Sequence, residues 1–394
     1  MIDDREKNSQ LSEILDLLAE RLDVPPESYA EVCRKYEDLG TWLKKDHLER
    51  FRSDAAIYPQ GSIRLGTSVC PIDPKGDFDV DIVYRRDLKK EAKTQEELKN
   101  ELEDQLQEYL AHLHASHSEV PGLQEGRRCW TLRYGDRFHV DILPGLPDDE
   151  AAEFNLRSIE DGILIPDSEL RNWQHSNPKG YAAWFDERQG LILSERREQM
   201  AKDNEVAVED IPQERVSTPL RRSIQILKRH RDLRHEGSPD TKPISVIITT
   251  LAAIAYRNET DVVATLMTIV PGIRRGLERR DEVYWVANPI NPKENFADKW
   301  QASPERATAF FEWLGRLEAD LGLVLAQTGI HKVAEALAPA LGQPVVAEAV
   351  ARYAKRMHEL RTAGKLGIDT RTGILSTSGA TPIPRHTNYG RERA

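Results

Sequence analysis

The chain has 394 residues, enough for two domains of ordinary size or for one unit with two lobes. Its 55 Lys and Arg against 66 Asp and Glu give a net charge of −11. This balance argues against a surface that holds long nucleic acids by neutralising their phosphates. Small charged substrates stay compatible with it, because a local basic pocket can exist on an acidic protein.

Neither a disulfide framework nor a zinc site is expected. The three cysteines, Cys33, Cys70 and Cys129, are far apart and show no C-x-x-C spacing. The N-terminus is charged, without the apolar segment that a signal peptide needs, and no stretch approaches the roughly 18 apolar residues of a membrane span. We therefore expect a cytoplasmic protein that does not enter a membrane.

The first elements in chain order are two helices and a strand with acidic residues. Residues 10–22 and 27–45 show helical spacing of apolar residues, with Pro25-Pro26 between them. We expect both helices to pack onto a neighbouring sheet. After a turn-rich stretch, the segment FDVDIVY (78–84) alternates apolar and mostly acidic residues. This alternation predicts a strand with one apolar face and one acidic face.

One further helix and a pair of strands follow. Thr94 and Glu97 have capping-box spacing before a helix predicted over 95–116, whose leucines recur every four residues. This helix is expected to cover one face of the sheet. Two alternating runs, WTLRY and RFHVDILPG, are separated by Gly135-Asp136, which predicts a two-residue hairpin turn. Asp141 would therefore lie on a strand.

Beyond these strands the chain becomes charged and then helical. Residues 186–217 are dense in charge and poor in large apolar residues, which indicates a linker or surface insertion. Thr218-Pro219 is a good start for a helix that ends near Asp232. Residues 244–256 are apolar nearly all round, which favours a buried helix, although their β-branched content leaves a strand open. The remaining segments are expected to form further helices and then an irregular tail: 258–273, 303–323, 330–360 and 366–394.

Three acidic residues carry the first chemical hypothesis. Asp79 and Asp81 are two apart on one strand, so their side chains point to the same side. Two like charges this close repel unless a cation lies between them, and carboxylate oxygens suit a hard ion such as Mg²⁺. Together with Asp141, they would hold two magnesium ions roughly 3.5–4 Å apart, one activating a hydroxyl and one bridging a triphosphate. A D-x-D pair alone is also what a solvent-facing strand edge shows.

Gly61-Ser62 is the second candidate feature. Glycine lets backbone N–H groups approach a phosphate, and a serine hydroxyl can donate to it. A Gly-Ser pair by itself is usually only a turn. The order of Gly-Ser, then Asp-x-Asp on a strand, then a single Asp on a later strand is much rarer, and this order raises the weight of all three acids.

Three motifs resemble the polymerase-β-like nucleotidyltransferase superfamily, with its G-S turn, its h-D-h-D strand and its third acid. They are QGSIRLGT (60–67), GDFDVDIVY (76–84) and FHVDILPG (138–145). More narrowly, they look like the bacterial CD-NTases, relatives of cyclic GMP-AMP synthase and oligoadenylate synthase that act in the anti-phage systems called CBASS. The resemblance extends over most of the chain, through TPLRRSIQILKRHRD (218–232), KPISVIITTLAA (242–253), NPINPKENFADKW (288–300) and PRHTNYG (384–390).

This resemblance implies an α+β fold. It consists of a polymerase-β-like core, with a mixed sheet and flanking helices, and a mainly helical, oligoadenylate-synthase-like C-terminal lobe. The expected order along the chain is N-terminal helices packing on the core, the catalytic lobe, a charged linker or insertion, the helical nucleotide-binding lobe and the irregular tail: 1–50, 51–185, 186–217, 218–365 and 366–394.

The resemblance also implies roles for single residues. Asp79 and Asp81 would bind both metals, two Mg²⁺ ions with Mn²⁺ as a substitute. Asp141 would complete the site as the carboxylate nearest the attacking hydroxyl. Three residues would line the donor triphosphate: Gln60, Gly61 and Ser62.

Two residues of the helical lobe match the lysine and serine that these enzymes extend toward the β- and γ-phosphates. They are Lys228 and Ser245, and a lysine point charge and a hydroxyl at a helix start suit that task. Lys228 also lies in a run of basic residues, and on an amphipathic helix such a run is usually the solvated face. Both interpretations of Lys228 stay open at this point.

The sequence therefore predicts a cyclic oligonucleotide synthase. It would join ATP and other NTPs into a cyclic di- or trinucleotide for anti-phage defence and release pyrophosphate. The alternatives are a nucleotidyltransferase that modifies an RNA end or a protein, and a catalytically silent nucleotide sensor. The resemblance further suggests a HORMA-domain activator or a CBASS ligase-like protein as partner, and double-stranded nucleic acid only as an activator.

Overall fold

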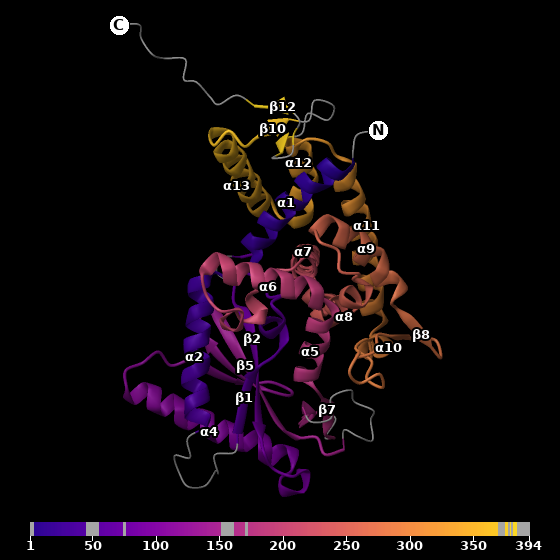
Figure 1. Cartoon of the computed structure of the whole chain (residues 1–394). Coiled ribbons are helices and arrows are strands. Elements are labelled where there is room, and N and C mark those ends of the chain that lie inside the picture. Colours follow the sequence, from indigo (N-terminus) through magenta and orange to yellow (C-terminus); the bar gives the residue numbers. More distant parts are fainter. Residues whose placement is uncertain are drawn as a thin grey trace. The chain divides into compact units, whose positions relative to one another are not determined.

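The computed structural model describes residues 4–44, 55–73, 76–150, 161–169, 172–368, 375–376, 379 and 381–383. They fall into two compact units (Figure 1). The sheet unit comprises the described residues of Asp23–Arg221 and Arg279–Asp298. The helical unit comprises those of Met1–Leu22, Arg222–Glu278 and Lys299–Ala394.

The sheet unit contains a mixed, seven-stranded sheet, as the predicted α+β class requires. Five strands follow the order β1-β2-β5-β4-β3, in which β2 and β5 are parallel and the other neighbours antiparallel. β6 pairs with the end of β5, and β7 pairs with β6. The strands are β1 (Ala55–Pro59), β2 (Phe78–Arg86), β3 (Gly122–Glu125), β4 (Trp130–Tyr134), β5 (Phe138–Pro147), β6 (Ile163–Ile165) and β7 (Gln174–Ser176).

The apolar face of this sheet forms a core with α2 (Pro26–Lys44) and α4 (Gln95–Ala115). Val80 and Ile82 of β2 pack there with Leu102 and Leu106 of α4, all four almost completely buried. The predicted capping box before α4 is confirmed, because Thr94 and Glu97 bond each other's backbone N–H. With one face of each strand committed to this core, the alternate side chains of β2 and β5 are left for the other face.

The hairpin between β4 and β5 differs from the prediction. Tyr134 pairs with Phe138, so the loop has three residues, Gly135 to Arg137, instead of two. Gly135 takes φ +61°, the left-handed conformation that a glycine adopts without steric cost. The predicted consequence still holds, because Asp141 lies on β5.

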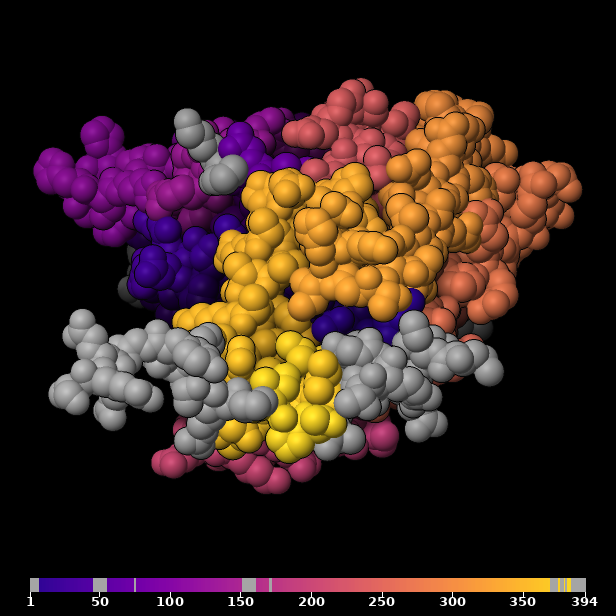
Figure 2. Space-filling model, turned by 90° about the horizontal axis from the view of Figure 1, so that it is seen from above, coloured from indigo at the N-terminus to yellow at the C-terminus, as the bar shows by residue number. Residues whose placement is uncertain are grey.

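The expectation that both N-terminal helices pack on the sheet is wrong for the first of them. α1 (Asp4–Leu22) packs in the helical unit against α9 (Val262–Arg275) and α13 (Gln343–Thr362). Its apolar stripe, with Ile14 and Leu18 fully buried, closes the core of that unit. In the space-filling view, indigo N-terminal surface lies beside the golden surface of the C-terminal helices (Figure 2).

Residues 244–256, for which the sequence left helix and strand open, contain the helix α8 (Ser245–Ala255). The segment 330–360 is divided at Gly342, where φ of +100° interrupts the helical backbone before Pro344 restarts it. The charged segment 186–217 belongs to the sheet unit and contains the helix α6 (Gly190–Asn204). Further helices are α5 (Pro178–Arg188), α6 (Gly190–Asn204), α7 (Pro219–Arg234), α8 (Ser245–Ala255), α10 (Lys299–Ala302), α11 (Pro304–Ala326) and α12 (Ile330–Leu341).

The tail, expected to be irregular, contains a small three-stranded sheet of β10 (Gly367–Ile368), β11 (Leu375–Ser376) and β12 (Thr381–Pro382). The motif PRHTNYG (384–390) lies outside the described residues. Within the described ranges, no helix is both long and apolar enough to cross a bilayer.

Candidate active site

The three predicted acids lie on one face of the central strand pair. Along β2 and β5, buried apolar residues alternate with Asp79, Asp81 and Asp141, which are exposed or half-buried. The register of the parallel pair sets Asp81 opposite Asp141 and Asp79 opposite His139. Residues in register on adjacent strands point to the same side, so the sequence prediction of a shared acidic face is confirmed.

β4 supplies a neighbour for the third acid. Thr131 pairs with Asp141 across the antiparallel β4 and β5, and its Oγ1 donates a hydrogen bond of 2.5 Å to Asp141 Oδ1. This bond fixes one oxygen of the carboxylate. Nearby Cys129 is not a nucleophile at neutral pH, because burial, reinforced by the Asp141 charge, raises the pKa of its thiol to about 11.

His139 connects two carboxylates on the same face. Its Nε2 lies 2.8 Å from Asp79 Oδ1 and its Nδ1 lies 2.8 Å from Asp77 Oδ2, while Arg133 Nη1 lies 2.9 Å from the same Asp77 oxygen. The hydrogen bond with Asp79 is the main reason that the pKa of His139 is raised to about 9. The sequence motifs assign no role to His139, although its position two residues before Asp141 on an alternating strand places it on the acidic face.

The Gly-Ser motif lies directly beside Asp81. Gln60 N donates to Asp81 O at 2.8 Å, and the next residue, Gly61, begins the five-residue helix α3 (Gly61–Leu65) with φ +60°. A Cβ on Gly61 would lie 2.2 Å from Asp81 Oδ2. Only glycine fits between the helix start and this carboxylate. Ser62 Oγ lies 2.9 Å from Ser68 Oγ.

These residues fit a magnesium site in their chemistry. The donors are carboxylate oxygens, which hard divalent cations prefer, and the missing Cβ of Gly61 gives the Asp81 carboxylate its room. Among the described residues, no three His, Cys, Asp or Glu groups are arranged to hold a metal ion as they stand. Asp79, whose side chain is 68% exposed, is bonded to His139. A metal ion at this face therefore requires side-chain movement among the three carboxylates.

Arg64 of the Gly-Ser motif anchors α3 to α5. Arg64 Nη2 lies 3.0 Å from one oxygen of Asp186, and Arg221 Nη2 lies 2.9 Å from the other. Burial lowers the pKa of Arg221 to about 10, and the Asp186 charge opposes that effect. The sequence did not indicate Asp186, because nothing in its local pattern shows which cations it meets.

Comparisons with known proteins agree with a nucleotidyltransferase site at these residues. Residues 55–144 match a family model described as the nucleotidyltransferase domain of cyclic GMP-AMP synthase DncV-like proteins. That range contains Gly61, Ser62 and all three acids. This segment of the chain is a DncV-like nucleotidyltransferase domain. The resemblance found in the sequence is thereby confirmed for the part that carries the acids.

Relatives match nearly the whole chain. A protein of Roseivirga ehrenbergii named c-di-GMP synthase is 26% identical over 387 residues, covering 97% of this chain and 98% of the relative. The cyclic dinucleotide synthase CdnG of Bradyrhizobium diazoefficiens is also 26% identical, with 97% and 95% covered. A solved structure of Bradyrhizobium CdnG with GTP superposes with a TM-score of 0.67 at 23% identity, over 87% of this chain and 99% of that one. A solved complex of E. coli CdnC with a HORMA protein superposes with a TM-score of 0.56 at 12% identity, over 84% and 96%.

The two predicted phosphate contacts of the nucleotidyltransferase, Lys228 and Ser245, belong to the helical unit. The interpretation of the basic run on α7 as a solvated face is wrong, because Lys228 is only 5% exposed and its basic neighbours are buried as well. Ser245 begins α8, and its Oγ accepts a hydrogen bond of 2.7 Å from Arg231 Nη1. The hydroxyl at a helix start, predicted from the sequence, is therefore present.

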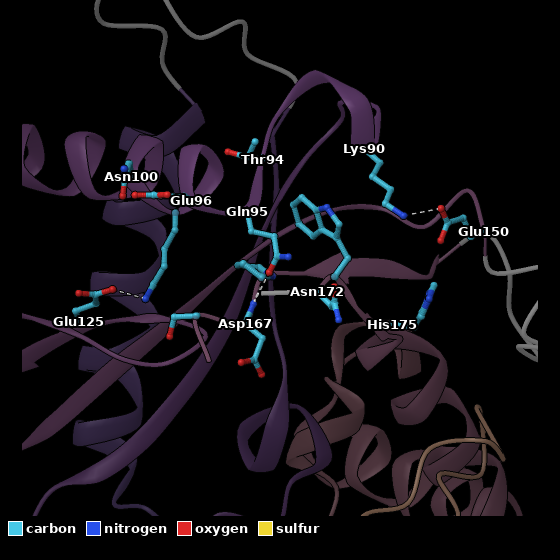
Figure 3. A pocket seen from close by; sticks show the side chains of 14 residues that line it. Lys90, Thr94, Gln95, Glu96, Asn100, Glu125, Glu150, Asp167, Asn172 and His175 are labelled. Atoms are coloured by element: carbon cyan, nitrogen blue, oxygen red, sulfur yellow. Dashed lines mark hydrogen bonds and ion pairs between the residues drawn. The ribbon is translucent and has the colours of Figure 1, made fainter. Parts of the chain in front are cut away.

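A separate pocket of about 980 Å³ lies in the sheet unit at the start of α4 (Figure 3). Lys90 reaches Glu150 at 2.7 Å, Lys99 reaches Glu125 at 2.5 Å, and the Gln95 amide oxygen accepts from Asp167 N at 2.8 Å. None of the three acids lines it. Its lysines are paired with carboxylates, so it lacks the surplus positive charge that a triphosphate requires.

Proposed function

We propose that the enzyme joins nucleoside triphosphates into a cyclic di- or trinucleotide. A 3′- or 2′-hydroxyl attacks an α-phosphate, and pyrophosphate leaves. The observation that carries the proposal is the shared face of Asp79, Asp81 and Asp141 with the Gly61 helix start against Asp81. Relatives named as cyclic dinucleotide synthases match 97% of the chain, which favours a cyclic product over a tailed polymer.

Each residue has a defined task in this proposal. Asp79 and Asp81 bind Mg²⁺, and Asp141, held by Thr131, lies nearest the attacking hydroxyl. When bound there, Mg²⁺, or Mn²⁺ in its place, would lower the pKa of that hydroxyl and neutralise charge on the leaving phosphates. The protein contributes mainly position and charge complementarity, since phosphoryl chemistry needs little covalent participation.

The nucleotide contacts rest on the resemblance. Gln60, Gly61 and Ser62 line the donor triphosphate with backbone N–H groups and a hydroxyl. By the same resemblance, Lys228 and Ser245 bind the β- and γ-phosphates. ATP and GTP are both candidate substrates; GTP is favoured by the Bradyrhizobium CdnG complex and by the name of the Roseivirga relative.

The biological context is proposed from the family resemblance of the sequence. The product serves as a second messenger in CBASS anti-phage defence. A HORMA-domain protein is the favoured activator, because E. coli CdnC forms a complex with one. A ligase-like protein and double-stranded nucleic acid are the other partners that the resemblance suggests.

One incubation tests the activity. Purified protein with all four NTPs and Mg²⁺ should yield a phosphatase-resistant cyclic product in mass spectrometry. Asp79→Ala with Asp81→Ala should abolish it while circular dichroism stays unchanged. Product at the wild-type level in this double variant would refute the assignment. Label transferred to RNA or protein would favour the macromolecule-modifying alternative, and nucleotide binding without turnover would favour the silent sensor.

A further inference from the structure

His139 is the strongest feature of the acidic face that the proposed mechanism does not use. It lies on β5 directly across from Asp79, and its ring nitrogens face Asp79 and Asp77 at 2.8 Å each. Its side chain is only 14% exposed, whereas that of Asp79 is 68% exposed. A nearly buried ring thus holds the most exposed of the three acids.

We infer that His139 is a positioning residue, which fixes the Asp79 carboxylate for metal binding by donating a hydrogen bond from Nε2. This inference rests on the proposed function, because it concerns the same metal site. Ligating carboxylates generally need such outer hydrogen bonds, and the loss of one typically costs about 10–100-fold in metal affinity.

The ring orientation is itself secured. Asp77 accepts from Nδ1, and Arg133, the cross-strand neighbour of His139 on β4, pairs with Asp77 at 2.9 Å. The bond to Asp77 therefore fixes the orientation of the imidazole ring independently of its bond to Asp79. Arg133, Asp77, His139 and Asp79 form a continuous chain of charged and hydrogen-bonded groups across the sheet surface.

An exposed aspartate without such a bond would sample several rotamers. A bond to one oxygen removes that freedom in advance, so less entropy is lost when a cation binds. A carboxylate has two oxygens with about four lone-pair sites, so a hydrogen bond from His139 is compatible with coordination of a metal by the same group.

Two variants of similar size separate the bond of His139 to Asp79 from its bond to Asp77. Glutamine places its amide nitrogen near the position of histidine Nε2, and asparagine places it near Nδ1. His139→Gln should therefore keep the bond to Asp79, whereas His139→Asn should keep only the bond to Asp77. Both variants are polar and close in size to histidine, so both should fold.

The chain offers a matched control. His175 on β7 bonds Asp148 through Nδ1 at 2.7 Å and is 18% exposed, so it resembles His139 in pairing and burial. It lies outside the acidic face. His175→Gln removes a histidine–aspartate bond of the same type and reports any general cost of such a loss.

The experiment is a Mn²⁺ titration of the full-length chain without nucleotide, followed by electron paramagnetic resonance of the free ion, together with the Mg²⁺ dependence of product formation. His139→Asn should weaken Mn²⁺ binding about 10-fold or more. It should raise the Mg²⁺ concentration for half-maximal rate by a similar factor, with the rate recovering at saturating Mg²⁺. His139→Gln and His175→Gln should bind Mn²⁺ like the wild type.

The outcomes distinguish the two proposals. Wild-type Mn²⁺ affinity in His139→Asn would overturn the role of His139. Equal weakening in His139→Gln would also overturn it, since that variant keeps the bond to Asp79. If Asp79→Ala leaves Mn²⁺ binding unchanged, both the metal assignment and the role of His139 are refuted. If the wild type binds Mn²⁺ yet forms no nucleotide product, the proposed function fails while the affinity comparison still decides the role of His139.

Discussion

Asp81 and Asp141 lie opposite each other on the parallel strands β2 and β5, and both side chains point to the same face. Like charges that face each other on adjacent strands repel and destabilise the sheet. Without a bound cation this repulsion lowers the stability of the fold, and the proposed Mg²⁺ would relieve it.

Asp141→Asn should therefore have opposite effects on activity and stability. Product formation should fall by at least ~100-fold, because a direct ligand matters at least as much as its outer partners. In EDTA the variant should melt slightly above the wild type. Differential scanning calorimetry with and without Mg²⁺ measures this, and Asp136→Asn in the exposed hairpin loop is the control. A melting temperature in EDTA below that of the wild type would contradict the repulsion argument.

Gly61→Ala and Gly135→Ala separate backbone strain from a clash at the site. Both glycines have φ near +60°, so each substitution should cost about 1–2 kcal/mol in unfolding free energy. The Cβ at position 61 would also meet Asp81 Oδ2 at 2.2 Å, whereas nothing lies within 4 Å of a Cβ at position 135. Urea unfolding should show a loss in both variants, and product formation should fall only in Gly61→Ala. Equal activity in the two variants would contradict the role assigned to this close approach.

The first helix should stabilise the helical unit. Leu18 of α1 is fully buried, so Leu18→Ala should lower the unfolding free energy by about 2–5 kcal/mol. Leu191→Ala is the matched control, since that leucine is 66% exposed and should change stability by less than about 0.5 kcal/mol. Chemical unfolding of both variants provides the comparison. A loss at Leu18 no greater than at Leu191 would show that α1 does not contribute to this core.

Acid should destabilise the helical unit through His230. Trp313 Nε1 donates to His230 Nδ1 at 3.0 Å, which keeps that nitrogen unprotonated, and Nε2 faces Asp320 at 3.1 Å. Burial lowers the pKa of His230 to about 4, although the hydrogen bond with Asp320 acts in the opposite direction and raises it. Between pH 6.5 and 4 the unfolded chain binds the proton and the folded chain does not, so stability falls with falling pH, by up to about 3 kcal/mol.

Urea unfolding of the wild type and of His230→Gln across pH 4–7 measures this effect. The variant lacks the titrating ring, so its stability should fall less steeply over the same range. Asp320 stays charged in this window, because its hydrogen bonds with His230 and Arg234 lower the pKa of its carboxyl group despite burial. Parallel curves for the two proteins would rule out His230 as the source of the pH dependence.

The site elements that follow from local patterns could be predicted from the sequence. Alternation alone places Asp79 and Asp81 on one side of a strand, and the spacing of Thr94 and Glu97 determines the start of α4. The register of β2 with β5 does not follow from either strand by itself. It depends on how the connecting elements bring the two strands together, so the opposition of Asp81 and Asp141 required the structure.

The environment of charged residues could not be predicted from the sequence where their partners lie far along the chain. A basic run such as that on α7 has the same sequence pattern whether it is solvated or buried, and only the packing around Lys228 distinguishes the two. His139 appeared as one polar position in an alternating strand. Its role depends on Asp79, which lies opposite it on the adjacent strand β2 and is distant in sequence.

The parallel pairing of β2 with β5 also has a consequence for folding kinetics. The chain must traverse α4 and the β3–β4 hairpin before β5 can align with β2, so loop-closure entropy is lost before this pairing contributes any stability. A slip of one residue would turn Asp141 toward the apolar core and bring Val140 or Ile142 to the surface. Acquisition of tight Mn²⁺ binding during refolding should therefore coincide with native strand alignment, later than the appearance of helical signal.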